Sequence, residues 1–141
     1  MPPLFEAVRS RYNYVFVDVG RTLSRISMPV LIGADYIIVV LGADPATVKL
    51  ARACLEFFTA AGITSRRLIL GLSRAVGRAG LTRDELSNRL GLPVPVTIPH
   101  DPDRFDAALA GGLPLTVREP QASSAASFEE IIRLFTRAVA S

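Results

Sequence analysis

The sequence has little of several residue types on which functional sites commonly depend. Among its 141 residues there is one cysteine, one histidine and no tryptophan. The single cysteine, Cys54, excludes an intramolecular disulfide framework, and its place in a helical pattern beside two phenylalanines predicts a buried, unreactive thiol. The lone histidine, His100, cannot form a catalytic triad without help, and no residues follow a metal-ligand spacing.

Lysine is nearly absent as well. Lys49 is the only lysine among sixteen basic residues, and the arginines are scattered in pairs rather than gathered in a stripe. With a net charge of only +3, the sequence gives no strong signal for nucleic-acid binding. Lys49 has no neighbouring glycine, and neither Gly-Lys-Ser/Thr nor G-x-G-x-x-G occurs. A recognisable phosphate-binding loop is therefore missing.

Long apolar runs are also missing. No run is long enough to span a membrane and no stretch is typical of a signal peptide, so we expect a cytoplasmic protein. Half of the residues are hydrophobic and 21% are charged, which excludes extensive disorder. The length predicts a single domain over residues 1–141, with a short linker at 120–127.

Four nearly continuous apolar runs predict strands that are buried on both faces. They lie at 14–18, 36–41, 67–72 and 94–98. Between and around them, capping patterns predict helices at 3–11, from the Asp44-Pro45 start to about 61, from the Thr82/Glu85 capping box to about 91, at 102–110, and from Ser127 to about 140. This alternation predicts an α/β fold with a parallel sheet of about four strands and helices on both faces.

The first predicted strand ends in an acid, in the run YVFVDVG at residues 14–20. A strand of this type delivers Asp18 to the carboxyl edge of the sheet, where ligand sites of α/β proteins form. In nucleotide-binding proteins such an acid holds Mg²⁺, directly or through water. The alternative is that Asp18 only caps the loop after its strand.

Two further predicted strands end in polar residues at the same edge, Ser73-Arg74 and Pro99-His100-Asp101. Arg74 would contact a base or phosphate, or simply be solvated. Asp101 also fits the N-cap of the following helix, and His100 fits a loop residue on the rim.

The order and spacing of these segments resemble the ParA/MinD family of deviant-Walker P-loop ATPases. The resemblance is carried by residues 12–18, 33–40 with 43–46, and 90–101 with 111–115, and it covers most of residues 5–140. The family's Walker A loop and first switch acid lie upstream and are absent here. The chain thus resembles a C-terminal half, a partial SIMIBI-like P-loop NTPase fold without its P-loop strand. The loop at 18–24 is most similar to the CpaE/TadZ-like branch, which localises pilus and secretion machinery.

The resemblance implies ATP and Mg²⁺ as cofactors, with Asp18 as a relict magnesium-side acid. It implies an adenine side formed by Ser73, Arg74, Pro99, His100 and Asp101. Ser73 stands where the family has asparagine, and a hydroxyl lacks the amide that both donates to and accepts from a purine edge. We therefore expect weak nucleotide binding, no catalytic residue, and a localisation or partitioning module that cannot hydrolyse ATP alone.

The missing strand also raises a question about the sheet. In the family topology the P-loop strand lies between the strand ending at Asp18 and the strand at 36–41. An empty gap would leave buried, unpaired backbone groups at about 1–3 kcal/mol each. We therefore expect a repacked sheet in the order 14–18, 36–41, 67–72, 94–98. Its outer edge at 14–18 would be exposed to a protein partner or to a second copy.

A different class of protein is the alternative, namely a receiver-like regulatory domain phosphorylated on Asp18, or an interaction domain without nucleotide. A receiver also needs an acidic pair after its first strand and a lysine after its last, and neither is present. The apolar residues of the last helix, such as Phe128 and Phe135, are expected to face the sheet. A membrane-surface role is not expected, because the polar face lacks a basic cluster.

Overall fold

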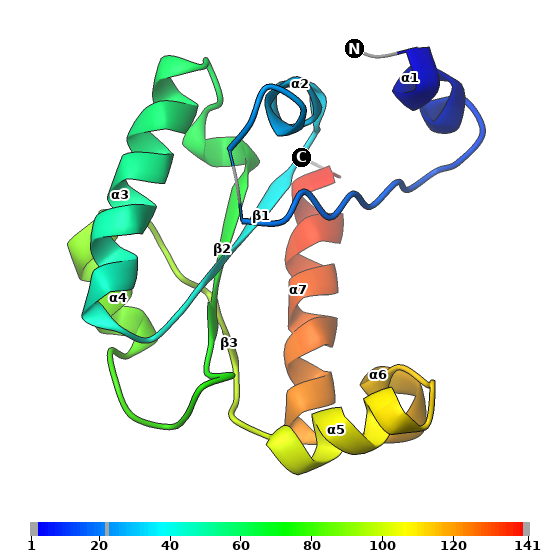
Figure 1. Ribbon diagram of the computed structural model, residues 1–141, viewed down its shortest axis with the longest axis vertical. Helices are drawn as coiled ribbons and strands as arrows, with labels where there is room; N and C mark the ends of the chain where they lie inside the picture. The colour runs from blue at the N-terminus through cyan, green and yellow to red at the C-terminus, as the bar shows by residue number, and fades with distance from the viewer. Residues whose placement is uncertain (1–2, 22, 140–141) are drawn as a thin grey trace.

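The computed structural model describes residues 3–21 and 23–139 and confirms the α/β fold. Its sheet contains three parallel strands in the order β1 (Ile37–Leu41), β2 (Leu68–Ser73) and β3 (Val96–Ile98). The helices are α1 (Pro3–Arg9), α2 (Ser27–Gly33), α3 (Pro45–Ala60), α4 (Arg83–Leu90), α5 (Pro102–Ala110), α6 (Leu115–Arg118) and α7 (Ser123–Val139), with a 3-10 turn at Ser65–Arg67. Helices α3 and α4 lie on one side of the sheet and α7 on the other, as predicted (Figure 1).

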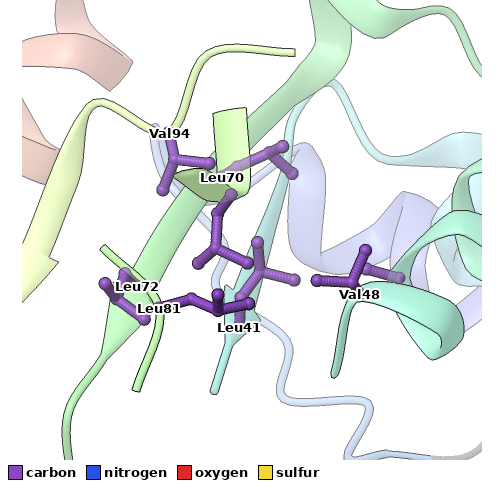
Figure 2. Close-up of a cluster of buried hydrophobic side chains, with 8 residues drawn as sticks. Leu41, Val48, Leu70, Leu72, Leu81 and Val94 are labelled. Carbon is purple, nitrogen blue, oxygen red and sulfur yellow. The ribbon is translucent and has the colours of Figure 1, made fainter. Parts of the chain in front are cut away.

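The core lies between the sheet and the helices α3 and α4. Side chains from β1 and β2 meet Val48 of α3 in this cluster, together with Leu81 and Val94 from the flanking loops (Figure 2). Leu72, a member of the cluster, is 0% exposed. Continuous burial of β2 on both faces is what its apolar run predicts for a central strand.

The predicted starts of two helices are confirmed by their hydrogen bonds. Asp44 caps α3, because its Oδ1 accepts from the backbone N of Thr47 at 2.9 Å. Thr82 and Glu85 form the predicted reciprocal capping box at the start of α4. These signals are local in sequence, which is why they could be read without the fold.

Helix α2 was not predicted, and a distant arginine holds it in place. The Nη2 of Arg67 donates to the backbone oxygens of Leu31 (3.1 Å), Ile32 (2.9 Å) and Ala34, at the carboxyl end of α2. A cation at this end satisfies carbonyl groups that have no partner within the helix. The pairing spans more than thirty positions of sequence, so no local pattern reveals it.

Helix α7 packs against the sheet, as its apolar spacing predicts. The Oγ of Ser127 donates to the backbone oxygen of Thr97 in β3 at 3.0 Å. The ring of Phe128 contacts Phe105 of α5 with a centroid distance of 6.4 Å. Within residues 3–21 and 23–139, no helix has both the length and the apolar character needed to cross a bilayer.

Two boundaries predicted around α7 are wrong. The helix begins at Ser123 rather than at Ser127. The predicted linker at 120–127 is therefore confined to the few residues between α6 and α7. Ser124 and Ala125 are almost completely buried, so tertiary packing extends the helix across small residues that resemble a linker in sequence.

The predicted strand at 14–18 and the repacked four-stranded sheet are also wrong. Residues 14–19 form an extended segment outside the sheet, and within the described part of the chain β1 pairs with a strand on one side only. Figure 1 shows this segment passing across the region of β1 before the chain enters α2. Phe135 of α7 explains the separation, because its ring contacts Tyr14 and Phe16 of the segment and also Tyr36 beside β1.

The energetic premise of the repacked sheet was incorrect as well. It assumed that unpaired backbone groups between 14–18 and β1 would be buried. Tyr14 is 58% exposed and Phe16 is 76% exposed, so water reaches the segment. Hydrated amide and carbonyl groups do not carry the penalty of buried ones, and the gap can remain open.

Candidate functional site

The carboxyl ends of β2 and β3 bring three predicted site residues together. Beyond the last paired residues, the backbone N of Arg74 donates to the backbone oxygen of Ile98 at 3.0 Å. The Nδ1 of His100 lies 3.0 Å from the backbone oxygen of Arg74 and 3.2 Å from that of Ala75. Carbonyl oxygens only accept, so this geometry assigns a proton to Nδ1 of His100.

Arg74 does not extend into solvent, because its guanidinium group is committed to the loop that follows β2. Its Nη1 donates to the backbone oxygens of Arg78 (2.6 Å) and Ala79 (3.3 Å), and its Nη2 donates to that of Leu81 (3.0 Å). The backbone N of Leu81 in turn donates to the backbone oxygen of Ala43 at 2.7 Å. Arg74 thus fixes a loop that covers the carboxyl end of β1.

Asp101 connects the strand end to helices α5 and α7. Its Oδ2 accepts from the Oγ of Ser124 in α7 at 2.7 Å, and Arg104 of α5 donates to both of its carboxylate oxygens at 3.2 Å. Arg104 also donates to Glu119, just after α6, at 2.8 Å. The Ser124 hydroxyl and Arg104 lower the pKa of Asp101, and partial desolvation opposes them. Asp101 stands at the N-cap position of α5, but its side chain makes no capping hydrogen bond.

Asp18 lies in the extended segment 14–19. The neighbouring Val19 packs against a second apolar cluster, which consists of Leu31, Ile37, Phe58 and Ile63. No described contact joins Asp18 to Ser73 or His100 among residues 3–21 and 23–139. Its Oδ1 accepts from the backbone N of Gly20 at 2.9 Å, the loop-capping contact of the alternative interpretation.

The described residues fit the base side of a nucleotide in part and the phosphate side poorly. Ser73 and Pro99 are half-buried, and the Ser73 hydroxyl and the Nε2 of His100 have no hydrogen-bond partner among residues 3–21 and 23–139. The donors of Arg74 are already used. In the same part of the chain, no three His, Cys, Asp or Glu residues gather in a way that would hold a metal ion. The glycine-rich loop that binds phosphates in P-loop proteins does not occur in the sequence.

Sequence reasoning missed a cavity of about 340 Å³ beside β1. We call it the edge groove. One wall is the extended segment 12–17 with Val19, the opposite wall is 36–38 at the start of β1, and Phe135 lies between them. At one end Arg9 donates to the backbone oxygen of Gly33 at 2.9 Å and pairs with Asp35 at 3.0 Å. The signal in the sequence was the absence of a strand that would separate the two walls.

Comparison with solved structures relates this fold to P-loop ATPases of the ParA/MinD type. A ParA family ATPase from Chlorobium tepidum TLS has a TM-score of 0.75 at 22% identity, with 88% of this chain covered and 51% of that one. The Pyrococcus furiosus cell division ATPase MinD has a TM-score of 0.76 at 17% identity, with 94% of this chain and 57% of that one covered. At these identities the likeness shows the fold alone.

The chain spans a little over half the length of these two ATPases. No family model matches the sequence. No curated protein matches it significantly either. The class of fold is thus established, and the resemblance to ParA and MinD proteins is confirmed at that level.

Proposed function

We propose that this chain is a ParA/MinD-like localisation or partitioning module of the cytoplasm that does not hydrolyse ATP by itself. The observation that carries the proposal is the likeness to two such ATPases over nearly the whole chain, while the chain spans little more than half of theirs. Within this class we assign it to the CpaE/TadZ-like branch, which serves pilus or secretion assembly. The loop at 18–24 supports that branch.

The inability to hydrolyse ATP follows from the chemistry of phosphoryl transfer. Catalysis depends on positioning and on charge stabilisation by P-loop amides, a lysine and Mg²⁺. The sequence contains no such loop, and Asp18 is held by a local turn with Gly20. We assign any residual nucleotide contact to the base, through Ser73, His100 and the Pro99–Asp101 turn, with Asp18 as the residual acid on the magnesium side.

Two measurements on the purified chain test the enzymatic part. Phosphate release from ATP should not exceed the background, and Asp18→Ala should not change it. Calorimetric titrations with ATP, ADP and adenosine should show weak binding with little gain from the phosphates. Turnover that disappears in Asp18→Ala, or a strong Mg²⁺-dependent preference for ATP, would show a phosphate site and contradict the proposal.

The localisation part is tested in cells. A fluorescent fusion of the full chain should gather at discrete sites where a pilus or secretion apparatus assembles, and should remain there when Asp18 is changed to Ala. Uniform fluorescence through the cytoplasm would contradict a localising role while leaving the fold and the nucleotide result unaffected.

A further inference from the structure

Helix α3 carries two apolar faces. Its inner face holds Val48, Ala51 and Phe58, which are buried in the two apolar clusters of the core. Leu50 and Phe57 lie on a different side of the helix, with 71% and 46% of their surface exposed. Figure 1 shows α3 at the outside of the molecule, and this second apolar face is therefore in contact with water.

The exposed apolar residues of α3 follow a regular spacing. Alternating steps of four and three residues join them along the helix, and all of them are exposed, in the order Ala46, Leu50, Ala53, Phe57 and Ala60. We call these residues the outer face of α3. Their spacing is the heptad spacing with which two helices pack along one seam. Single exposed apolar side chains are common, but a seam along nearly the whole of a helix indicates a helical partner.

Two opposite charges flank the outer face. Lys49 directly precedes Leu50 and Glu56 directly precedes Phe57, so the two charges stand at equivalent positions of successive heptads, on one side of the seam. Both are exposed, and neither takes part in an ion pair within residues 3–21 and 23–139. Charges at such positions select the partner helix and its orientation.

We propose that the outer face of α3 is a contact between two copies of this chain, whose α3 helices pack antiparallel about a two-fold axis. Leu50 of each copy then packs against Ala53 of the other copy, and Phe57 packs against Ala46 of the other copy. Each large side chain meets a small one, which lets the two helices approach closely without leaving a void. The two-fold axis closes the assembly as a dimer, because each copy offers the same surface to the other.

Charge complementarity identifies a second copy as the occupant. The alignment that puts Leu50 opposite Ala53 also brings Lys49 of each copy beside Glu56 of the other. The chain thus carries both members of a matched charge pair, at the spacing that its own antiparallel copy requires. In a parallel pair, Ala53 would meet Ala53 and Lys49 would face Cys54, so neither the volumes nor the charges would match.

The expected dimer is weak and independent of nucleotide. Helix α3 has 16 residues and is about 24 Å long, so two such helices bury less than the roughly 1,200 Å² of a standard stable interface. We therefore expect reversible association at high protein concentration. Ser73, Arg74 and His100 lie on other elements, so this inference goes beyond the proposed function and does not rest on it.

Sedimentation equilibrium of the full chain without nucleotide tests the contact. A reversible monomer–dimer equilibrium should appear between about 10 and 500 µM protein. Leu50→Glu places a charge in the seam and should weaken dimerisation about tenfold or more. The control is Leu109→Glu on α5, where the leucine is 83% exposed and outside the outer face, and this variant should dimerise like the parent. Because both leucines are exposed, both variants should keep the far-UV circular dichroism of the parent.

An exchange of charges tests the antiparallel alignment. Lys49→Glu or Glu56→Lys alone should weaken dimerisation about fivefold, since each creates like-charge contacts on both sides of the two-fold axis. The double variant Lys49→Glu/Glu56→Lys should recover the dissociation constant of the parent to within about twofold. An equimolar mixture of the two single variants should associate more tightly than either variant alone, because opposite charges face each other in the mixed dimer. These differences should shrink at about 0.5 M salt.

Each of three results would overturn the proposal. A chain that stays monomeric at about 500 µM would leave the outer face to a helix of a different protein. Unchanged dimerisation of Leu50→Glu would place the contact elsewhere on the molecule. Failure of the double charge exchange to restore association would exclude the antiparallel alignment. None of these measurements involves ATP or the position of the protein in the cell, so they are distinct from the tests of the proposed function.

Discussion

Strand β2 and the segment 14–18 have similar apolar sequences, but β2 is the central strand of the sheet and the segment lies outside the sheet. Both are short apolar runs that predict a buried parallel strand. In β2, Leu72 is 0% exposed and the strand has a neighbour on each side. In the segment, Phe16 is 76% exposed, and no strand among the described residues pairs with it. The difference lies outside both runs, in whether an adjacent strand is available.

This comparison shows what an apolar run does and does not specify. It specifies an extended conformation with side chains suited to burial, and the segment keeps that conformation. It does not supply the backbone partner, because sheet pairing is a property of two segments. Residues 14–18 are therefore a strand in sequence and an unpaired segment in structure. The following predictions test this contrast, from the largest expected effect to the smallest.

Truncation of one apolar side chain in each run should give the largest difference in the free energy of unfolding. Leu72→Ala should reduce the free energy of unfolding by about 2–5 kcal/mol, because it leaves a cavity in the buried core. Val17→Ala in the segment should change it by about 0.5 kcal/mol or less. Urea unfolding measures both. A large loss for Val17→Ala would mean that the segment is packed in solution.

Two glycines with positive φ offer the next contrast. A Cβ on Gly80 would lie 2.3 Å from the backbone oxygen of Ala43, at a φ of +105°. Gly80→Ala should therefore cost about 2–4 kcal/mol. Gly20, at the end of the segment, has a φ of +67° and open space around it, so Gly20→Ala should cost only about 1 kcal/mol. Equal losses in thermal unfolding would show that the two sites are equally packed.

Removal of the ring that separates the segment from β1 should have a moderate effect. Phe135 lies 5.8 Å from Tyr14, 6.1 Å from Phe16 and 5.5 Å from Tyr36, measured between ring centroids. Phe135→Ala should cost about 1–2 kcal/mol and shift the NMR signals of Tyr14. Ile132→Ala, at an exposed position on the same helix, is the control and should do neither. Unchanged Tyr14 signals would mean that the segment does not rest on α7.

The smallest effect concerns pH. The Ser124 hydroxyl and Arg104 hold the pKa of Asp101 below its usual value of 3.8, so the ionised form favours the folded state. This contribution is complete above the unfolded pKa and is lost as the pH falls through the lower folded pKa. The midpoint temperature of thermal unfolding should fall as the pH is lowered from about 4 to about 2, and Asp101→Asn should make this fall smaller. Asp103→Asn on the exposed side of α5 should keep the decline of the parent.

Local chemistry explains which parts of the fold could be predicted. The starts of α3 and α4 depend on Asp44 and Thr82, whose partners lie three positions away. Strands β1, β2 and β3 were predicted from their apolar runs. These predictions are confirmed because each strand pairs with a neighbour within the chain. Helix α2 could not be predicted, since Arg67 caps it across more than thirty positions. Cys54 is half-buried, and burial raises the pKa of its thiol, in line with an unreactive side chain.

The candidate site also contains contacts that the sequence could predict and contacts that it could not. Ser73, Arg74 and His100 meet because parallel strands end at one edge, a rule that needs only the strand assignments. The same rule also counted on a strand at 14–18, and the structure has no strand there. The bond from Ser124 to Asp101 was also beyond sequence reasoning, because its partners lie 23 positions apart and join through tertiary packing.

Helix α7 has a mechanical consequence. Near one end Ser124 holds Asp101 at the carboxyl edge of the sheet, and near the other Phe135 touches Tyr14 and Phe16. The helix has 17 residues, so it is about 25 Å long, and over that length an α-helix behaves as a stiff rod. A shift of the whole helix along its axis therefore moves the backbone at Phe135 and at Ser124 together. Helix α7 therefore links the open side of the sheet, at Tyr14 and Phe16, to the strand-end residue Asp101.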